Sequence, residues 1–258
     1  MAFEVPMGRI MGCVLLWAVL CLTGCQSGPD RHVDQDISIS DDIRLHRVDG
    51  DVWVHTTYFD VPGYGRCPAN GLLVVDGSEA MLIDLPWTDK QTAELCDWVS
   101  QHWEVKVTTV VPTHFHEDCM GGLDEAHRRG AASHALDQTI GLARQKQLPV
   151  PQHGFSDEVT LRCRKTPVVV KYHGAGHTTD NIVAWLPRQR ILFADCLVKS
   201  LGSRSLGNTR DGDVDAYPAT LQKVRAAYPE AKLVVPGHGA WGGTDLIDHT
   251  LSLCESGR

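Results

Sequence analysis

Four segments of this chain share a pattern in which an apolar, strand-like run is followed directly by a histidine, aspartate or cysteine. The residues in question are His114, His116, Asp118, His177, Cys196 and His238. Polar side chains delivered where a strand stops are typical of sites that a rigid scaffold positions. A fold for this chain therefore has to bring the four strand ends together.

The chemistry of these residues favours a metal. In an extended chain, positions i, i+2 and i+4 project to one side, so we expect His114, His116 and Asp118 to converge while Phe115 and Glu117 point elsewhere. Imidazole, carboxylate and thiolate are the ligands that zinc takes in proteins. Taken alone, the His-x-His-x-Asp motif fits exposed polar residues on a loop equally well. The three other strand ends, which carry His177, Cys196 and His238, favour a metal site over that alternative.

The number of donors indicates how many ions are held. One tetrahedral zinc cannot use four histidines, one aspartate and one cysteine, whereas two ions can, with three protein ligands each and a shared water. A closed structural site uses four protein ligands, so the count predicts two zinc ions per chain and a catalytic role. The other histidines, including His173 beside the turn at 174–178, are predicted to be packed or exposed rather than ligating.

The order of the expected elements predicts an α/β fold. Strand-like runs at 43–48, 52–58, 71–75 and 80–84 precede a helix at 89–103 capped by Thr88, a strand at 105–111 and a helix at 122–129. Further strands are expected at 159–161, 168–172, 182–186, 191–193 and 232–235, and further helices at 216–227 and after Thr244. Strands followed by helices, twice over, predict two sheets packed together with helices outside.

The N-terminal segment predicts export. An apolar run after Arg9 is too short to span a bilayer and ends in Leu22-Thr23-Gly24-Cys25, which resembles a bacterial lipobox. We therefore expect a lipoprotein signal peptide at 1–24, a lipid anchor on Cys25, a flexible tether over 25–42 and one domain over 43–258. Gln26 lacks an acidic retention signal, so the expected location is the periplasmic side, anchored to the outer membrane. A plain cleaved signal or an uncleaved anchor are the alternatives.

The net charge of the chain limits the classes of binding partner that we expect. The chain has 258 residues and a net charge of −8, so nucleic acid is not an expected partner. We expect a monomer that recognises a small molecule through local groups. Export permits disulfides, but the spacing of the cysteines beyond the leader (Cys67, Cys96, Cys119, Cys163, Cys196 and Cys254) assigns no pairing.

With these residues assembled, the sequence resembles the metallo-β-lactamases, specifically the di-zinc group with a cysteine ligand (class B, subclass 1). The resemblance runs from about Val52 to His249. It implies an αβ/βα four-layer sandwich with the metals in a groove at one edge. It also implies that the first zinc is held by His114, His116 and His177, and the second by Asp118, Cys196 and His238.

Two positions separate this chain from related hydrolases. Glyoxalase-like and lactonase-like members of the wider superfamily usually carry a histidine directly after the aspartate, where this chain has Cys119, and an aspartate where it has Cys196. The effect of Cys119 beside the site is left open. Lys199 matches a family lysine that binds the substrate carboxylate, and Asn208 matches an asparagine near the lactam carbonyl. The alternatives are a solvated lysine and a Gly-Asn turn.

Three aromatic residues are candidates for substrate contact. The segment 58–65 resembles a mobile hairpin that closes over substrate in this family, so Phe59 and Tyr64 would offer apolar contact, and Trp87 would line the groove. An ordinary β-turn with exposed aromatic side chains is an equally good interpretation of the hairpin.

The resemblance implies hydrolysis of the β-lactam amide bond of penicillins, cephalosporins and carbapenems, which confers antibiotic resistance. A metal-bound hydroxide oriented by Asp118 would attack the carbonyl, since zinc lowers the pKa of bound water to about 7. Lys199 would hold the carboxylate of the β-lactam and Asn208 the carbonyl oxygen. Two rivals remain: a superfamily hydrolase acting on a thioester, lactone or phosphodiester, and a zinc-binding lipoprotein without turnover.

Overall fold

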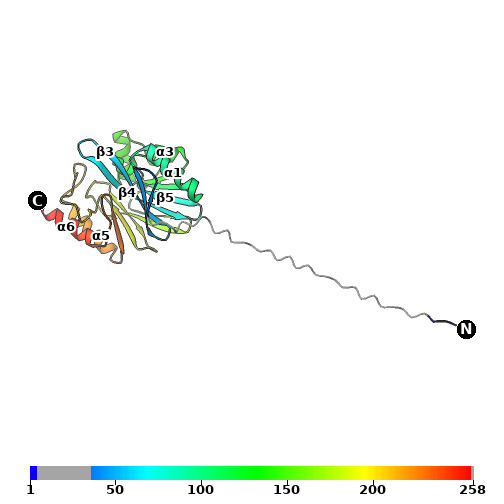
Figure 1. Ribbon diagram of the computed structural model, residues 1–258. Helices are drawn as coiled ribbons and strands as arrows, with labels where there is room; N and C mark the ends of the chain where they lie inside the picture. Colours follow the sequence, from blue (N-terminus) through cyan, green and yellow to red (C-terminus); the bar gives the residue numbers. More distant parts are fainter. Residues whose placement is uncertain (5–35, 257–258) are drawn as a thin grey trace.

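The computed structural model describes residues 1–4 and 36–256 (Figure 1). The expected signal peptide beyond residue 4, the expected lipid site Cys25 and the tether up to residue 35 lie outside the described residues. Strand structure begins earlier than the expected domain boundary at 43. Strand β1 (Asp36–Ser38) lies within the segment expected to be a tether, and it pairs antiparallel with the next strand through Ile37 and Leu45.

The described strands form two sheets. In the larger sheet the spatial order equals the chain order: β1, β2 (Ile43–Asp49), β3 (Val52–Val61), β4 (Gly65–Asp76), β5 (Glu79–Ile83), β6 (Lys106–Val111), β7 (Ala132–Leu136) and β8 (His153–Phe155). The smaller sheet has the order β13 (Leu233–Pro236), β12 (Ile191–Asp195), β11 (Ile182–Leu186), β10 (Thr166–Tyr172) and β9 (Glu158–Cys163). Pairing is antiparallel from β1 to β5 and from β9 to β12, and parallel from β5 to β8 and between β12 and β13.

Helices cover both outer faces. They are α1 (Asp89–Trp103), α2 (Glu117–Met120), α3 (Leu123–Arg128), α4 (Asp137–Lys146), α5 (Tyr217–Ala227) and α6 (Asp245–Ser256). In Figure 1, α1 and α3 lie on one side of the sheets, and α5 and α6 lie on the other. None of the helices in the described residues is long and apolar enough to cross a membrane.

Three apolar clusters separate four layers. One joins the larger sheet to α1 and α3 through residues such as Trp53 and Leu95, and a second fills the space between the sheets, with Leu72 and Phe193. The third joins the smaller sheet to α5 and α6. Strands that are buried on both faces must be apolar throughout, as Ile182–Leu186 is. The αβ/βα four-layer sandwich that the resemblance implied is confirmed.

Local signals set most of the element boundaries. The Thr88 side chain accepts a hydrogen bond from the Gln91 backbone N–H at 3.2 Å, which caps α1 as predicted, and α1 ends at Trp103, where Glu104 adopts a left-handed conformation. The segment 131–155 was not assigned from sequence, yet it forms β7, α4 and β8. Its apolar pattern is weak because only one face of α4, with Ile140 and Ala143, is buried.

Candidate metal centre

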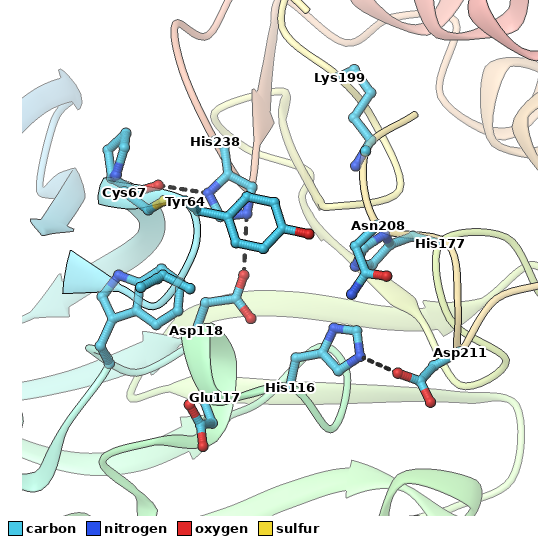
Figure 2. Close-up of a pocket in the computed structure, with 14 residues that line it drawn as sticks. Tyr64, Cys67, His116, Glu117, Asp118, His177, Lys199, Asn208, Asp211 and His238 are labelled. Atoms are coloured by element: carbon cyan, nitrogen blue, oxygen red, sulfur yellow. Dashed lines mark hydrogen bonds and ion pairs between the residues drawn. The ribbon is translucent and has the colours of Figure 1, made fainter. Parts of the chain in front are cut away.

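The six predicted donors come from four loops at one edge of the sandwich. His114 and His116 follow β6, and Asp118 lies in α2 directly after them. His177 lies between β10 and β11, while Cys196 and His238 follow β12 and β13. A cavity of about 540 Å³ opens over them, and His116, Asp118, His177 and His238 line it (Figure 2). The fold thus brings the four strand ends together, as the sequence required.

The donors group around two centres. His114, His116 and His177 each present a ligand atom within 4.8 Å of one another, with His114 Nε2 at 3.0 Å from His116 Nδ1. Around the second centre, Asp118 Oδ2 lies 3.2 Å from His238 Nε2 and 3.7 Å from Cys196 Sγ. Asp118 Oδ1 is 3.9 Å from His114 Nε2, so the two groups adjoin.

Hydrogen bonds on the far side of the rings fix which nitrogens face the centre. His238 Nδ1 donates to the Pro68 carbonyl at 2.6 Å, and His116 Nε2 donates to Asp211 Oδ2 at 3.2 Å, because carbonyl and carboxylate oxygens only accept. The ring nitrogens that face the centre are then His116 Nδ1 and His238 Nε2. Once unprotonated, they would direct their lone pairs at the same region as the Asp118 carboxylate, where a cation would pair with all of them, so this donor set fits a metal.

Burial and neighbouring charges shift the pKa values of these groups. Burial and the positive charge of His114 lower the pKa of His116, and burial raises the pKa of the Cys196 thiol to about 12. Burial opposes ionisation of Asp118, but its hydrogen bond to His238 and the charge of His114 hold its pKa well below the usual range. A thiol with a raised pKa becomes a ligand only when a cation displaces its proton, which zinc can do.

The local geometry of the His-x-His-x-Asp segment differs from the expectation. His116 itself is extended, with a φ of −73° and a ψ of 160°, but α2 begins at the next residue, so Asp118 reaches the centre from the first turn of a helix. Phe115 points away into the core, as expected, with 4% exposure. Glu117 was expected to point elsewhere, but it lines the cavity, because the helical turn rotates it toward the opening.

Lys199 and Asn208 both line the cavity, and in Figure 2 they lie on the same side of it as His177. The backbone N–H of Lys199 donates to Thr250 Oγ1 at 2.8 Å, which ties the loop after β12 to α6. Asn208 Oδ1 accepts from the Arg210 backbone N–H at 3.2 Å, so this side chain also stabilises its own turn.

The aromatic candidates separate into two groups. Strands β3 and β4 form a hairpin whose turn carries Tyr64, which lines the cavity with 75% of its surface exposed. Trp87 also lines the cavity, and its ring lies 6.5 Å from that of His238. Phe59 does not line this cavity. It stacks on Trp87, with ring centroids 5.7 Å apart, and lines a neighbouring hollow.

The sequence interpretation missed three carboxylates that hold the ligand loops. Asp84 accepts from the Thr113 backbone N–H at 2.6 Å and from its hydroxyl at 2.9 Å, directly before His114. Asp195 lies 2.9 Å from His114 Nδ1, and Asp211 binds His116. Asp84 and Asp195 each follow an apolar run, which is the signal that had identified the ligands themselves. Asp211 lies in a polar loop that carries no such signal.

Charges within this group interact strongly. Burial and the nearby Asp195 raise the pKa of Asp84 well above its usual value. Burial opposes ionisation of Asp195, but the charge of His114 and the hydrogen bond to it lower the pKa of Asp195 to about 2. The pKa of the Cys119 thiol is raised well above its usual value by burial and by Asp195, so Cys119 stays protonated.

The remaining histidines and cysteines of the described residues have other surroundings. His173 Nε2 lies 3.1 Å from the Tyr228 hydroxyl, and His134 stacks on His153. Within residues 36–256 every metal-competent group includes His114, and none includes any other histidine than His116 and His177. The cysteines described as free thiols are Cys67, Cys96, Cys119, Cys163, Cys196 and Cys254.

Comparison with known proteins gives consistent relatives. No protein-family model matches the chain. A protein named metallo-beta-lactamase type 2 from Bacteroides fragilis is 45% identical over 216 residues, which is 84% of this chain and 87% of that protein. A protein of the same name from Bacillus cereus is 37% identical over 83% of each chain. The solved structure of a metallo-beta-lactamase from Pontibacter korlensis superposes with a TM-score of 0.79 at 38% identity, covering 83% of this chain and 99% of that one.

Proposed function

The chain belongs to the metallo-β-lactamase family, and on that premise we propose that it hydrolyses the β-lactam amide bond of penicillins, cephalosporins and carbapenems and so confers antibiotic resistance. The observation that carries the proposal is the convergence of six His, Cys and Asp donors in two adjoining groups, and four of these donors line an open cavity. Such a site has room for a substrate on its exposed side, which a closed structural zinc site lacks.

We assign two zinc ions to this site. The first would be held by His114, His116 and His177, and the second by Asp118, Cys196 and His238, which is the cysteine-containing ligand set of subclass 1. The grouping of donor atoms within 4.8 Å supports the first set, and the contacts of Asp118 with His238 and Cys196 support the second. Bound zinc supplies Lewis acidity, which polarises a carbonyl oxygen and makes hydroxide available near neutral pH.

The residues of the chain supply binding and orientation. Lys199 carries a positive charge on the cavity wall and would pair with the carboxylate that β-lactam antibiotics share. Asn208 would donate its side-chain amide to the lactam carbonyl as negative charge develops on that oxygen. Asp118, which would hold the second zinc, stays ionised and would orient the attacking water through its carboxylate.

The hairpin and Trp87 would bind the apolar side chains of the antibiotic. Val61, Tyr64 and Trp87 contribute apolar and aromatic surface to the cavity lining. Phe59 would act indirectly, because its stacking on Trp87 fixes the orientation of that ring.

The decisive experiment is hydrolysis of a penicillin, a cephalosporin and a carbapenem by the purified full chain, with zinc, after chelation by EDTA and after zinc is returned. We expect turnover that disappears with chelator and returns with zinc. Cys196→Ser should lose most of this activity, whereas Cys96→Ser, which alters a buried thiol in α1, should retain it. A folded, zinc-loaded protein that turns over lactones or thioesters but no β-lactam would refute the proposal, as would zinc binding without turnover.

We further propose that the mature protein is a monomeric lipoprotein on the periplasmic side, anchored to the outer membrane through Cys25. The support is the lipobox-like Leu22-Thr23-Gly24-Cys25 and the segment that follows it. Mass spectrometry of the membrane fraction should find a lipid on an N-terminal Cys25, and Cys25→Ala should release the protein into the soluble fraction. A mature chain without lipid would contradict the anchor, and light scattering of the detergent-purified protein tests the monomer.

A further inference from the structure

We propose that Asp195 is a positioning residue that holds His114 in the orientation needed for zinc. The inference rests on the proposed zinc-dependent function. It concerns a carboxylate on the far side of the ligand, away from the cavity and the substrate.

The contact is direct and fully enclosed. Asp195 Oδ2 lies 2.9 Å from His114 Nδ1, and the two side chains are 3% and 0% exposed. Since a carboxylate only accepts, Nδ1 carries a hydrogen, so Nε2, which faces His116, is the nitrogen of His114 that is left to bind a metal. The carboxylate thus selects the one tautomer of His114 that can bind a metal at the cavity.

The backbone at Asp195 adopts a conformation that is unfavourable for a residue with a side chain. Asp195 has a φ of 47°, in the left-handed region that favours glycine, at a point where the pairing of β12 with β13 is irregular. Glycine would relieve that strain. Gly237 lies so close that a Cβ there would be 2.5 Å from Asp195 Oδ1, so the neighbouring strand end leaves room for the carboxylate.

Among the described residues, the other groups that contact His114 Nδ1 are weaker acceptors than a carboxylate. Cys119 Sγ lies 3.2 Å from the same nitrogen, but sulfur is a weak hydrogen-bond partner. Thr113 Oγ1 is more distant at 3.4 Å and already donates to Asp84. A carboxylate that accepts from a ligating imidazole raises its basicity and fixes its ring, and such partners affect metal affinity strongly.

The arrangement parallels that of His116, whose Nε2 donates to Asp211. Asp211 is reached from the cavity side and is part of its lining, whereas Asp195 is not. His177 Nδ1 is buried without a hydrogen-bond partner. Asp195 therefore supports one specific ligand of the first group from within the protein core.

The test compares Asp195→Gly with Arg190→Gly in the zinc-loaded full chain. Both variants place glycine at a left-handed position, since Arg190 has a φ of 58°, but Arg190 is exposed and remote from the centre. The readout is the dissociation constant of each metal, measured by competition with a chromophoric chelator. Cobalt substitution adds a spectrum in which the thiolate band of Cys196 reports the second site separately.

We expect Asp195→Gly to weaken the first metal by about 10- to 100-fold, to keep the cobalt–thiolate band, and to unfold at or above the wild-type temperature. Arg190→Gly should bind both metals as the wild type does. Asp195→Asn, which keeps an accepting oxygen without the charge, should show a smaller loss, and it serves for the same comparison should the glycine variant fold poorly.

Wild-type affinity for both metals in the Asp195 variants would overturn the proposal. So would a third bound zinc that disappears with Asp195, because His114, Cys119 and Asp195 would then form a metal site of their own. Metal affinity is measured without any substrate. The metal affinities of the Asp195 variants can therefore be interpreted even if the protein does not hydrolyse β-lactams.

Discussion

A single added methyl group at Gly121 tests whether α2, which carries Asp118, is fixed against the loop that carries Trp87. A Cβ at this position would lie 1.9 Å from the Trp87 carbonyl oxygen, 2.6 Å from its carbonyl carbon and 2.7 Å from the Glu117 carbonyl oxygen. All three atoms belong to the backbone, so no side chain can rotate away. Gly121→Ala therefore has to move either α2 or the loop at Trp87.

The expected cost follows from packing and from the helix. Inserting a methyl group into a filled site costs about 1–3 kcal/mol, and the backbone contacts place Gly121→Ala at the upper end of that range. Gly141→Ala is the matched control, because its Cβ in α4 meets nothing within 4 Å. Replacing glycine with alanine inside a helix stabilises by about 0.5–1 kcal/mol. The two variants should thus shift the free energy of unfolding in opposite directions.

Urea denaturation of the zinc-free proteins measures both changes, and chelator competition then measures zinc affinity. We expect Gly121→Ala to lower the denaturation midpoint and to weaken zinc binding, because Asp118 shifts with α2. Gly141→Ala should raise the midpoint and leave zinc affinity unchanged. If Gly121→Ala matches the wild type in both measurements, the close approach of α2 to Trp87 is not a fixed feature of the fold, and the reasoning fails.

Three further predictions test the charged groups. Lys199→Ala should raise KM about tenfold or more while kcat changes little, because one hydrogen bond to a charged group is worth about 1.5–3 kcal/mol. If steady-state kinetics show an unchanged KM, another residue binds the substrate carboxylate. Cys196→Ser should bind one zinc ion per chain instead of two, and metal analysis that still finds two would exclude Cys196 as a ligand. Burial lowers the pKa of His55 from 6.5 to about 4. Between pH 6.5 and pH 4 the unfolded chain therefore binds a proton at His55 that the folded chain does not bind. The free energy of unfolding consequently decreases as the pH falls through that range. The loss from His55 amounts to about 3 kcal/mol, and zinc-free His55→Gln should show a correspondingly weaker pH dependence of unfolding between pH 6.5 and 4; an identical pH profile would contradict it.

The sequence by itself determined the ligand types and most of the elements. A metal site needs specific donor atoms, so His114, Cys196 and His238 stand out wherever they follow an apolar run. The helix at 89–103 was predictable because Thr88 caps it and its apolar residues recur at helical spacing. The run 182–186 is apolar at every position because both of its faces are buried, and composition alone reveals that.

Only the tertiary structure decided how the ligands are held. His116 and Asp211 are 95 positions apart, and Asp195 and His114 are 81 apart, so no local pattern links the members of either pair. The conformation of α2 could not be predicted from the sequence either, because this four-residue helix forms against the packed loop at Trp87. Donor identity is a property of single residues and can be read along the chain, whereas ligand orientation depends on long-range hydrogen bonds that exist only once the two sheets have packed.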